Sequence, residues 1–280
     1  YGNEYLFVRL GKLYKKFCIA MAEFGFEDLI KDIAANKKSM AQTRFSKIER
    51  IENPKDVYTE VCQTIADYYG EYGFKYAKSK QTLTLKRKNS EFTYKISFSS
   101  SRYNAADRYV EVTAFANVLS KKYKQWQTEN KIGSTNYIPK DFVAGGQIGN
   151  MQEKSKWLKW NVANPETRVA EVEDIIRSIN QYAVPFLESF ENIPKFISYI
   201  EKQGNYFGIL TSQSLASFLM YVASKESVEK TFPTFFTIRQ SWDTYESAMN
   251  QLKKTGKVPD GTYWSQIAFL TKQLGLKLEK

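Results

Sequence analysis

Apolar and polar positions alternate between residues 72 and 118, and this pattern predicts an antiparallel sheet. A period of two gives each strand one dry face and one wet face. The apolar positions that alternate with polar ones are Leu83, Leu85, Phe92, Tyr94, Ile96 and Phe98. Asn89-Ser90 separates the two runs and suits a tight hairpin. Burial of the apolar face would then fix the strand register.

The same alternation continues after a polar connection at residues 99–107. Its apolar positions are Val110, Val112, Ala114 and Ala116, while Tyr109 and Phe115 fall on the opposite face. Apolar side chains on both faces indicate a strand that is covered on both sides. Before the first strand, Gly73 stands where a helix end most often needs a left-handed residue, so the strands should begin near Phe74.

Helical patterns flank the predicted sheet. Asn53-Pro54 is a helix start, and the stripe of Val57, Val61 and Ile65 behind it should pack on the apolar sheet face. Asn164-Pro165 starts a second helix, which Pro185 should break or kink.

Two segments between these helices are less regular. Residues 157–162 alternate and predict one more strand, whereas residues 145–149 are rich in glycine. The glycine run lacks the spacing of a phosphate-binding or dinucleotide-binding loop, so it is expected to be a loop or a short strand.

These patterns predict an α+β fold, with an antiparallel meander of four to five strands packed by helices. Residues 1–52 form an N-terminal helical segment and a basic linker, residues 53–203 the α+β domain, and residues 204–280 a C-terminal segment of three helices. The helices of the last segment are marked by Leu215 to Val222, by Phe235 to Leu252, and by Trp264 to Leu274.

The net charge of +11 over 280 residues favours acidic partners such as nucleic acid, an anionic membrane surface or an acidic protein. Lysines are scattered over every predicted polar face, so solubility is the simpler explanation for most of them. No stretch is long and uncharged enough to span a bilayer. The cytoplasm is the expected compartment, although a start at Tyr1 is also compatible with a removed signal sequence.

The chemistry of the chain is restricted because it contains no histidine. This excludes Ser-His and Cys-His catalysis and histidine metal sites. Cys18 and Cys62 are expected to be buried thiols, with a disulfide as the alternative. Glu171 and Asp174 are a carboxylate pair of the kind that usually lies on a solvated helix face. We expect a protein that is not an enzyme, with no catalytic residue, metal or cofactor.

Two stretches could bind nucleic acid. Strand parity places three lysines on the wet sheet face, with further basic and aromatic residues bordering it in the connection and the next strand; the set is Lys86, Lys88, Lys95, Arg102, Tyr103 and Arg108. Basic residues also alternate with aromatic ones from Lys121 to Trp126, a mixture that can bind phosphates and stack bases. A helix or strand extension anchored by Tyr123 and Trp126 is the favoured interpretation of this second stretch.

The order of the parts resembles a family of small bacterial α+β domains of unknown function. The likeness covers about residues 53–203 and rests on Tyr72-Gly73-Phe74, the meander, the tryptophan strand, Asn164-Pro165-Glu166 and residues 183–188, Ala-Val-Pro-Phe-Leu-Glu. It implies an α+β fold and a bacterial origin, and it supplies no catalytic residue.

Members of such families resemble immunity or phage-defence accessory proteins. We therefore expect a non-enzymatic binding protein whose partner is another protein, preferably with an acidic surface; nucleic-acid binding by the basic sheet face is the alternative. A helix over that face would favour the protein partner, whereas clustered, uncovered lysines would favour nucleic acid. The oligomeric state does not follow from the sequence.

Overall fold

The computed structural model describes residues 53–106, 108–132, 140–152, 155–203, 212–239, 241–256 and 263–279. The two helices and the basic connection that the sequence predicts before Asn53 lie outside the described residues, as does Cys18. Cys62 is a buried free thiol, in agreement with the sequence.

The sheet is antiparallel and confirms the predicted α+β fold. Five strands follow each other in the order β1-β2-β3-β4-β5, and a sixth, β6, pairs with the start of β4. Their bounds are β1 Lys75–Ala77, β2 Thr82–Lys86, β3 Phe92–Ser99, β4 Glu111–Ser120, β5 Phe142–Gln147 and β6 Trp160–Asn161. The sequence predicts four to five strands, and the additional one is β5, the glycine-rich segment that could have been a loop.

The register places the alternating apolar residues on one face. Leu83 pairs with Ile96, Ile96 pairs with Ala116, and all three side chains are fully buried. On its second face β4 is covered only in part, as a partly overlaid strand would be: Thr113 and Gln147, the partner of Phe115, are buried, whereas Phe115, Asn117 and Leu119 are half-buried. We call the buried face the covered face and the opposite one the open face.

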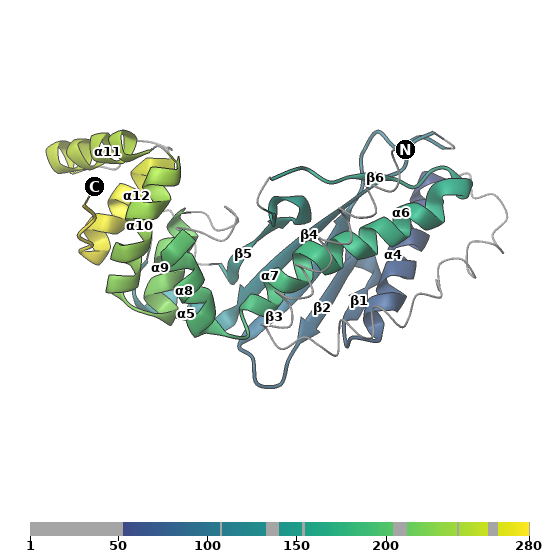
Figure 1. Ribbon diagram of the computed structural model, residues 1–280, viewed down its shortest axis with the longest axis horizontal. Coiled ribbons are helices and arrows are strands. Elements are labelled where there is room, and N and C mark those ends of the chain that lie inside the picture. The colour runs from purple at the N-terminus through teal and green to yellow at the C-terminus, as the bar shows by residue number, and fades with distance from the viewer. Residues whose placement is uncertain are drawn as a thin grey trace, which may run out of the picture.

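Helices on one side of the sheet bury the covered face. They are α4 (Pro54–Gly70), α6 (Pro165–Ser178) and α7 (Val184–Ser189), and Figure 1 shows α6 and α7 running across the strands. The predicted caps are present: Asn53 accepts a hydrogen bond from the Lys55 amide at 2.9 Å, and Asn164 from the Glu166 amide at 3.0 Å. These side chains satisfy amides that have no partner inside the helix.

Pro185 does not break the helical path. A π-helical turn, Ile179–Ala183, joins α6 to α7, and the Val184 amide donates to the Ile179 carbonyl. Pro185 then falls in the first turn of α7, where its missing N–H costs little. The wide turn therefore accommodates the proline without ending the helix.

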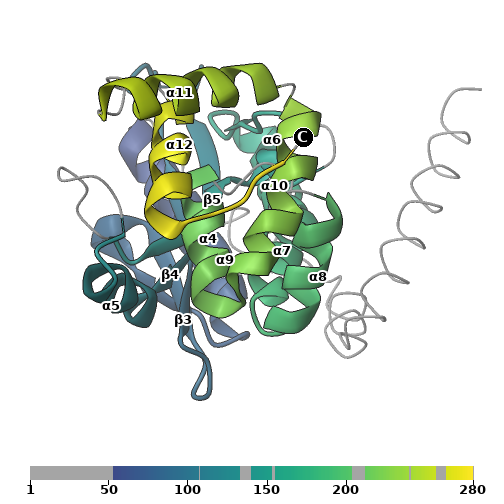
Figure 2. The same cartoon turned by 90° about the vertical axis from the view of Figure 1, so that its left-hand side faces the viewer.

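The C-terminal helices gather at one end of the sheet (Figures 1 and 2). The remaining helices are α5 (Lys121–Glu129), α8 (Ile193–Gln203), α9 (Ser212–Val222), α10 (Lys225–Arg239), α11 (Trp242–Thr255) and α12 (Tyr263–Leu274), with 3₁₀ turns at Lys78–Lys80 and Ile148–Asn150. Figure 2 shows α11 lying across α10 and α12.

The single helix predicted from Phe235 to Leu252 is in fact the end of α10 followed by α11. The two helices meet at Ser241, whose amide donates to the Phe236 carbonyl at 3.0 Å. The rings of Phe236 and Trp242 pack 4.8 Å apart across this corner, so the apolar spacing continues although the helix does not. Periodicity alone cannot reveal such a turn, because both helices bury their stripes in the same core.

One hydrophobic cluster connects all of these parts. Phe92 in β3 contacts Phe190, after α7, at 5.5 Å and Phe218 in α9 at 6.3 Å between ring centroids. The described helices after residue 211 therefore share their buried residues with the sheet.

Candidate functional site

The structure divides the predicted basic surface into two groups. Lys86 and Lys95 lie on the open face, because Lys86 pairs with Thr93 and Lys95 pairs with Thr84. Lys88 is exposed but lies in the turn after β2, not in the strand. These three lysines lie near the hairpin that joins β2 to β3.

The other three predicted residues lie beyond the opposite end of β3, which ends at Ser99, about 14 Å along the strand from Lys95. Arg102 donates to the Tyr103 hydroxyl at 2.6 Å and lies 4.8 Å from its ring centroid. Arg108 is exposed in a turn, whereas the sequence placed it in the next strand, which begins only at Glu111. These three residues therefore lie in the loop at the far end of the sheet, apart from the three lysines, and only the placement of Arg108 in a strand is wrong.

The fold adds a lysine that the sequence analysis missed. Lys75 in β1 pairs with Thr84, which pairs with Lys95, so Lys75 and Lys95 share the open face. Two strand spacings place their backbones about 10 Å apart. Because Lys75 follows Phe74, the sequence indicates which face of the strand Lys75 occupies. Only the register of β1 with β2 shows which residues lie next to Lys75 on that face.

Two aromatic residues stand on the same face. Phe115 in β4 pairs with Ser97 in β3, and its ring lies 5.8 Å from the ring of Trp157, edge to face. Trp157 precedes β6 and is 57% exposed. The sequence predicts Trp157 within a strand, but the strand β6 contains only Trp160 and Asn161.

Apart from Leu119, which pairs with Thr93, the rest of the open face is mostly polar and carries little negative charge. Thr84 and Thr93 pair with the lysines, Asn117 pairs with Lys95 and Ser97 pairs with Phe115, and none of these four polar residues is buried. Within the described part of the chain, no ion pair engages Lys75, Lys86 or Lys95. At the far end of this face, Glu111 accepts a hydrogen bond from Tyr109, which raises the pKa of the tyrosine, and lies 3.8 Å from the Lys159 ammonium.

The second basic and aromatic stretch is not a binding surface of the expected kind. Tyr123 in α5 is fully buried, and its ring packs against Phe218 at 5.9 Å and Tyr221 at 5.5 Å. Lys121, Lys122 and Lys124 remain exposed on the outer side of the helix. The prediction that aromatic residues anchor this segment is confirmed.

The carboxylate pair considered in the sequence is engaged in the structure. Asp174 accepts a hydrogen bond from the Trp160 indole at 2.6 Å and pairs with Arg177. Burial and the neighbouring Asp174 raise the pKa of Glu171. The hydrogen bond between Trp160 and Asp174 thus connects β6 to α6.

The described residues provide neither a metal cluster nor a membrane span. They contain no group of three or more Cys, Asp or Glu side chains arranged to hold a metal ion. Across the same residues, no helix combines the length and apolar character needed to cross a membrane. Of the predicted residues, Lys86 and Lys95 lie on the open face, and with Lys75 they make this face the candidate site.

Comparison of the chain with protein-family models, curated proteins and solved structures finds no match.

Proposed function

We propose that the open face binds single-stranded nucleic acid. The observation that carries this proposal is the position of Lys75, Lys86 and Lys95 on one sheet face that no described helix covers. Such lysines can contact consecutive phosphates, since strand geometry holds them about 8–10 Å apart.

The aromatic pair supports a single strand over a duplex. Trp157 and Phe115 offer ring faces beside the lysines, and unpaired bases stack on such rings. Single-stranded segments can spread their unstacked bases over an exposed sheet face. The hydroxyl and amide groups of Thr84, Thr93 and Asn117 add hydrogen-bonding positions between the two groups.

A protein partner is the other function predicted from the sequence. The immunity or defence role that the family resemblance implies would act through such a partner. A helix over the open face would favour it, whereas α4, α6 and α7 lie on the covered face and the C-terminal helices gather at one end of the sheet. We therefore rank nucleic acid first and treat a protein partner as the competing outcome.

Fluorescence anisotropy tests the proposal with labelled DNA and RNA strands of about ten nucleotides, a length within the usual site size of sheet-based binders. Binding at low salt should weaken as salt rises. Three phosphate contacts on a single strand correspond to a slope of about −2 in log affinity against log salt.

A matched pair of triple variants distinguishes the effect of the open face on affinity from the effect of net charge. Replacing Lys75, Lys86 and Lys95 by Glu should weaken binding on the order of 100-fold, because repulsion replaces three phosphate contacts. Replacing Lys121, Lys122 and Lys124 by Glu changes the net charge equally but leaves the open face intact, and should change affinity by less than about threefold. Equal losses in both variants, or no binding by the wild type at low salt, would contradict the proposal.

A further inference from the structure

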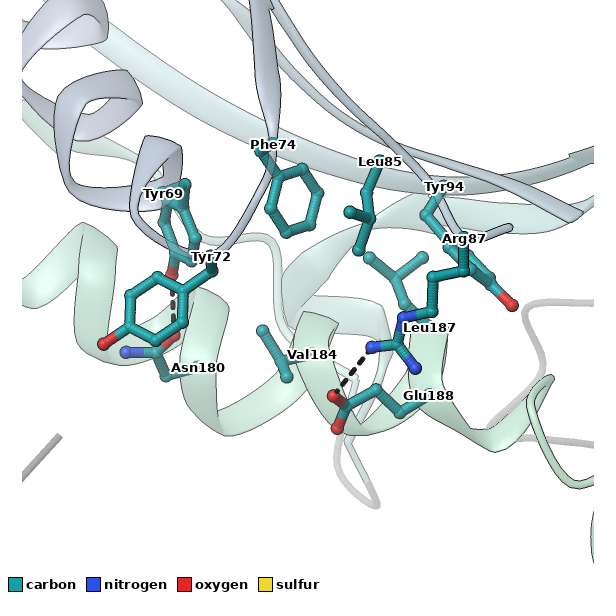
Figure 3. A pocket seen from close by; sticks show the side chains of 10 residues that line it. All are labelled: Tyr69, Tyr72, Phe74, Leu85, Arg87, Tyr94, Asn180, Val184, Leu187 and Glu188. Atoms are coloured by element: carbon teal, nitrogen blue, oxygen red, sulfur yellow. Dashed lines mark hydrogen bonds and ion pairs between the residues drawn. The ribbon is translucent and has the colours of Figure 1, made fainter. Parts of the chain in front are cut away.

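A cavity of about 150 Å³ lies on the other side of the sheet, between β2 and β3 and the helical segment from the π turn through α7. Figure 3 shows its lining, in which Tyr69 comes from the last turn of α4, Tyr72 from the turn after it, and Val184 and Glu188 from α7. A cavity of this volume in another protein holds one benzene ring. The space therefore fits a ligand with a single ring.

The walls are largely aromatic and aliphatic. The apolar and aromatic side chains that line the cavity are Tyr69, Tyr72, Phe74, Leu85, Tyr94, Val184 and Leu187. Phe74 and Leu85 face Val184 across the space in Figure 3. Walls of this kind favour a ring, and the few polar groups among them decide which ring is accepted.

The amide that lines the cavity is already engaged. Asn180 accepts a hydrogen bond from the Tyr69 hydroxyl at 2.7 Å, and its nitrogen donates to the Tyr68 hydroxyl at 3.3 Å. Asn180 lies in the π turn, a feature that is often found at functional sites. This amide therefore forms part of the wall and does not select the ligand.

The carboxylate of Glu188 is different. Its Oε1 atom accepts a hydrogen bond from Arg87 at 3.4 Å, whereas its Oε2 atom is buried and has no hydrogen-bond partner among the described residues. The side chain of Glu188 is only 11% exposed. A buried carboxylate oxygen without a donor is costly, so a ligand that supplies one gains affinity.

The local charge balance favours a cation. Arg87 lies near two carboxylates, Glu188 and Glu191, the second at 3.8 Å, and Glu191 also accepts a hydrogen bond from Tyr94. One guanidinium cannot neutralise both carboxylates when both are ionised. Burial raises the pKa of Glu188 to about 7, so this carboxylate is fully ionised only above neutral pH.

We propose that this cavity binds a small organic cation, an amine carried on a single ring, whose ammonium donates to Oε2 of Glu188. The ring would occupy the space between Phe74, Leu85 and Val184. This site is independent of the open face, since the two lie on opposite sides of the sheet. The ammonium would supply the donor that Oε2 lacks and compensate the second negative charge.

Benzylamine, which has one ring and one ammonium, is the probe, and toluene is its uncharged counterpart. Calorimetry or protein NMR shifts should give a Kd of about 1 mM or tighter for benzylamine at pH 8, a range that a ligand of this size can reach. Toluene should bind at least about tenfold more weakly, because it leaves Oε2 without a donor.

Two isosteric variants separate the roles of the carboxylates. Glu188→Gln should weaken benzylamine binding at least about tenfold, whereas Glu191→Gln should change it by less than about threefold, because Glu191 is already paired with Arg87 and Tyr94. Val184→Phe should abolish binding by filling the cavity. Urea midpoints for each variant establish that it is folded.

The wild type alone provides a second test. Benzylamine stays protonated across this range, as alkyl amines do, so its affinity should rise up to about tenfold for each pH unit from pH 5 until Glu188 is ionised near pH 7. The proposal is overturned if benzylamine does not bind, if toluene binds equally well, or if the affinity is the same at pH 5 and pH 8.

Discussion

The two faces of one sheet place adjacent residues in opposite environments. Lys95 and Ile96 are neighbours in β3, yet Ile96 is fully buried under the helices while Lys95 reaches the open face. On the open face water solvates each lysine, so charge can be placed there at little cost in stability. On the covered face burial raises the pKa of Glu188, whose Oε2 atom has no hydrogen-bond partner among the described residues.

This difference shows which observation can indicate function on each face. On the open face, the informative observation is that charged and aromatic side chains lie together without a covering helix. On the covered face, packing explains the apolar side chains. The informative observation there is a buried polar group without a hydrogen-bond partner. The following substitutions test the comparison.

The largest effect is expected where a core side chain is removed. Ile96→Ala leaves a cavity in the covered face and should lower the free energy of unfolding by about 2–5 kcal/mol. Lys95→Ala, one residue away on the open face, should change it by less than about 0.5 kcal/mol. Urea midpoints measure both, and equal midpoints would show that the faces are assigned wrongly.

Removing the buried charge should stabilise the protein in a defined pH window. Burial raises the pKa of Glu188 to about 7 from an ordinary value of 4.5, so the folded state holds a proton that the unfolded chain has lost. The wild type should therefore lose stability relative to Glu188→Gln as pH rises from about 4.5 to 7, by up to about 3 kcal/mol.

Unfolding of the two proteins by urea at pH 4.5, 6 and 8 measures this difference. Glu191→Gln serves as the control, because Glu191 has two partners in the fold. If the difference in the free energy of unfolding between wild type and Glu188→Gln does not grow with pH, the pKa of Glu188 is not raised in the folded state.

Adding one methyl group at Gly149 should displace the backbone segment that carries Trp157. A Cβ atom on Gly149 would lie 1.9 Å from the Lys156 carbonyl oxygen and 2.7 Å from Leu158. Gly149→Ala should therefore cost about 1–3 kcal/mol and move the segment that carries Trp157. Thermal unfolding and tryptophan fluorescence measure the two effects.

Gly70→Ala is the matched control for this substitution. Gly70 is the last residue of α4, and a Cβ atom there meets nothing within 4 Å. Alanine in a helix should leave stability unchanged or raise it by about 0.5–1 kcal/mol. If Gly149→Ala and Gly70→Ala have the same effect on stability, the close backbone approach at Gly149 does not determine the stability of this segment.

The smallest effect on stability is expected at the exposed ring. Trp157→Ala should change the free energy of unfolding by no more than about 0.5 kcal/mol, because most of the side chain is in water. Affinity for a single strand should nevertheless fall by about 1–3 kcal/mol if one base stacks there. Tyr103→Ala, at an exposed ring in the β3–β4 loop, should leave the affinity unchanged.

Local patterns in the sequence were enough to predict the elements around the sheet. Asn53 and Asn164 precede proline and cap helices, and Gly73 adopts the left-handed conformation with φ of +83°. The alternation through Ile96 correctly predicted which side of β3 is buried. Each of these signals depends on a few neighbouring residues, whose backbone preferences and burial act locally.

The candidate sites depended on contacts between distant parts of the chain. The sequence placed Lys86 and Lys95 on one face. Lys75 joins them only because β1 pairs with β2, and Trp157 contacts Phe115 only because the segment before β6 runs past that residue. It gave no sign that Glu188 would lie beside Arg87, 101 residues earlier. Strand parity is a property of one segment, whereas the partners of a side chain are set by how segments pack, and only the tertiary structure decides that.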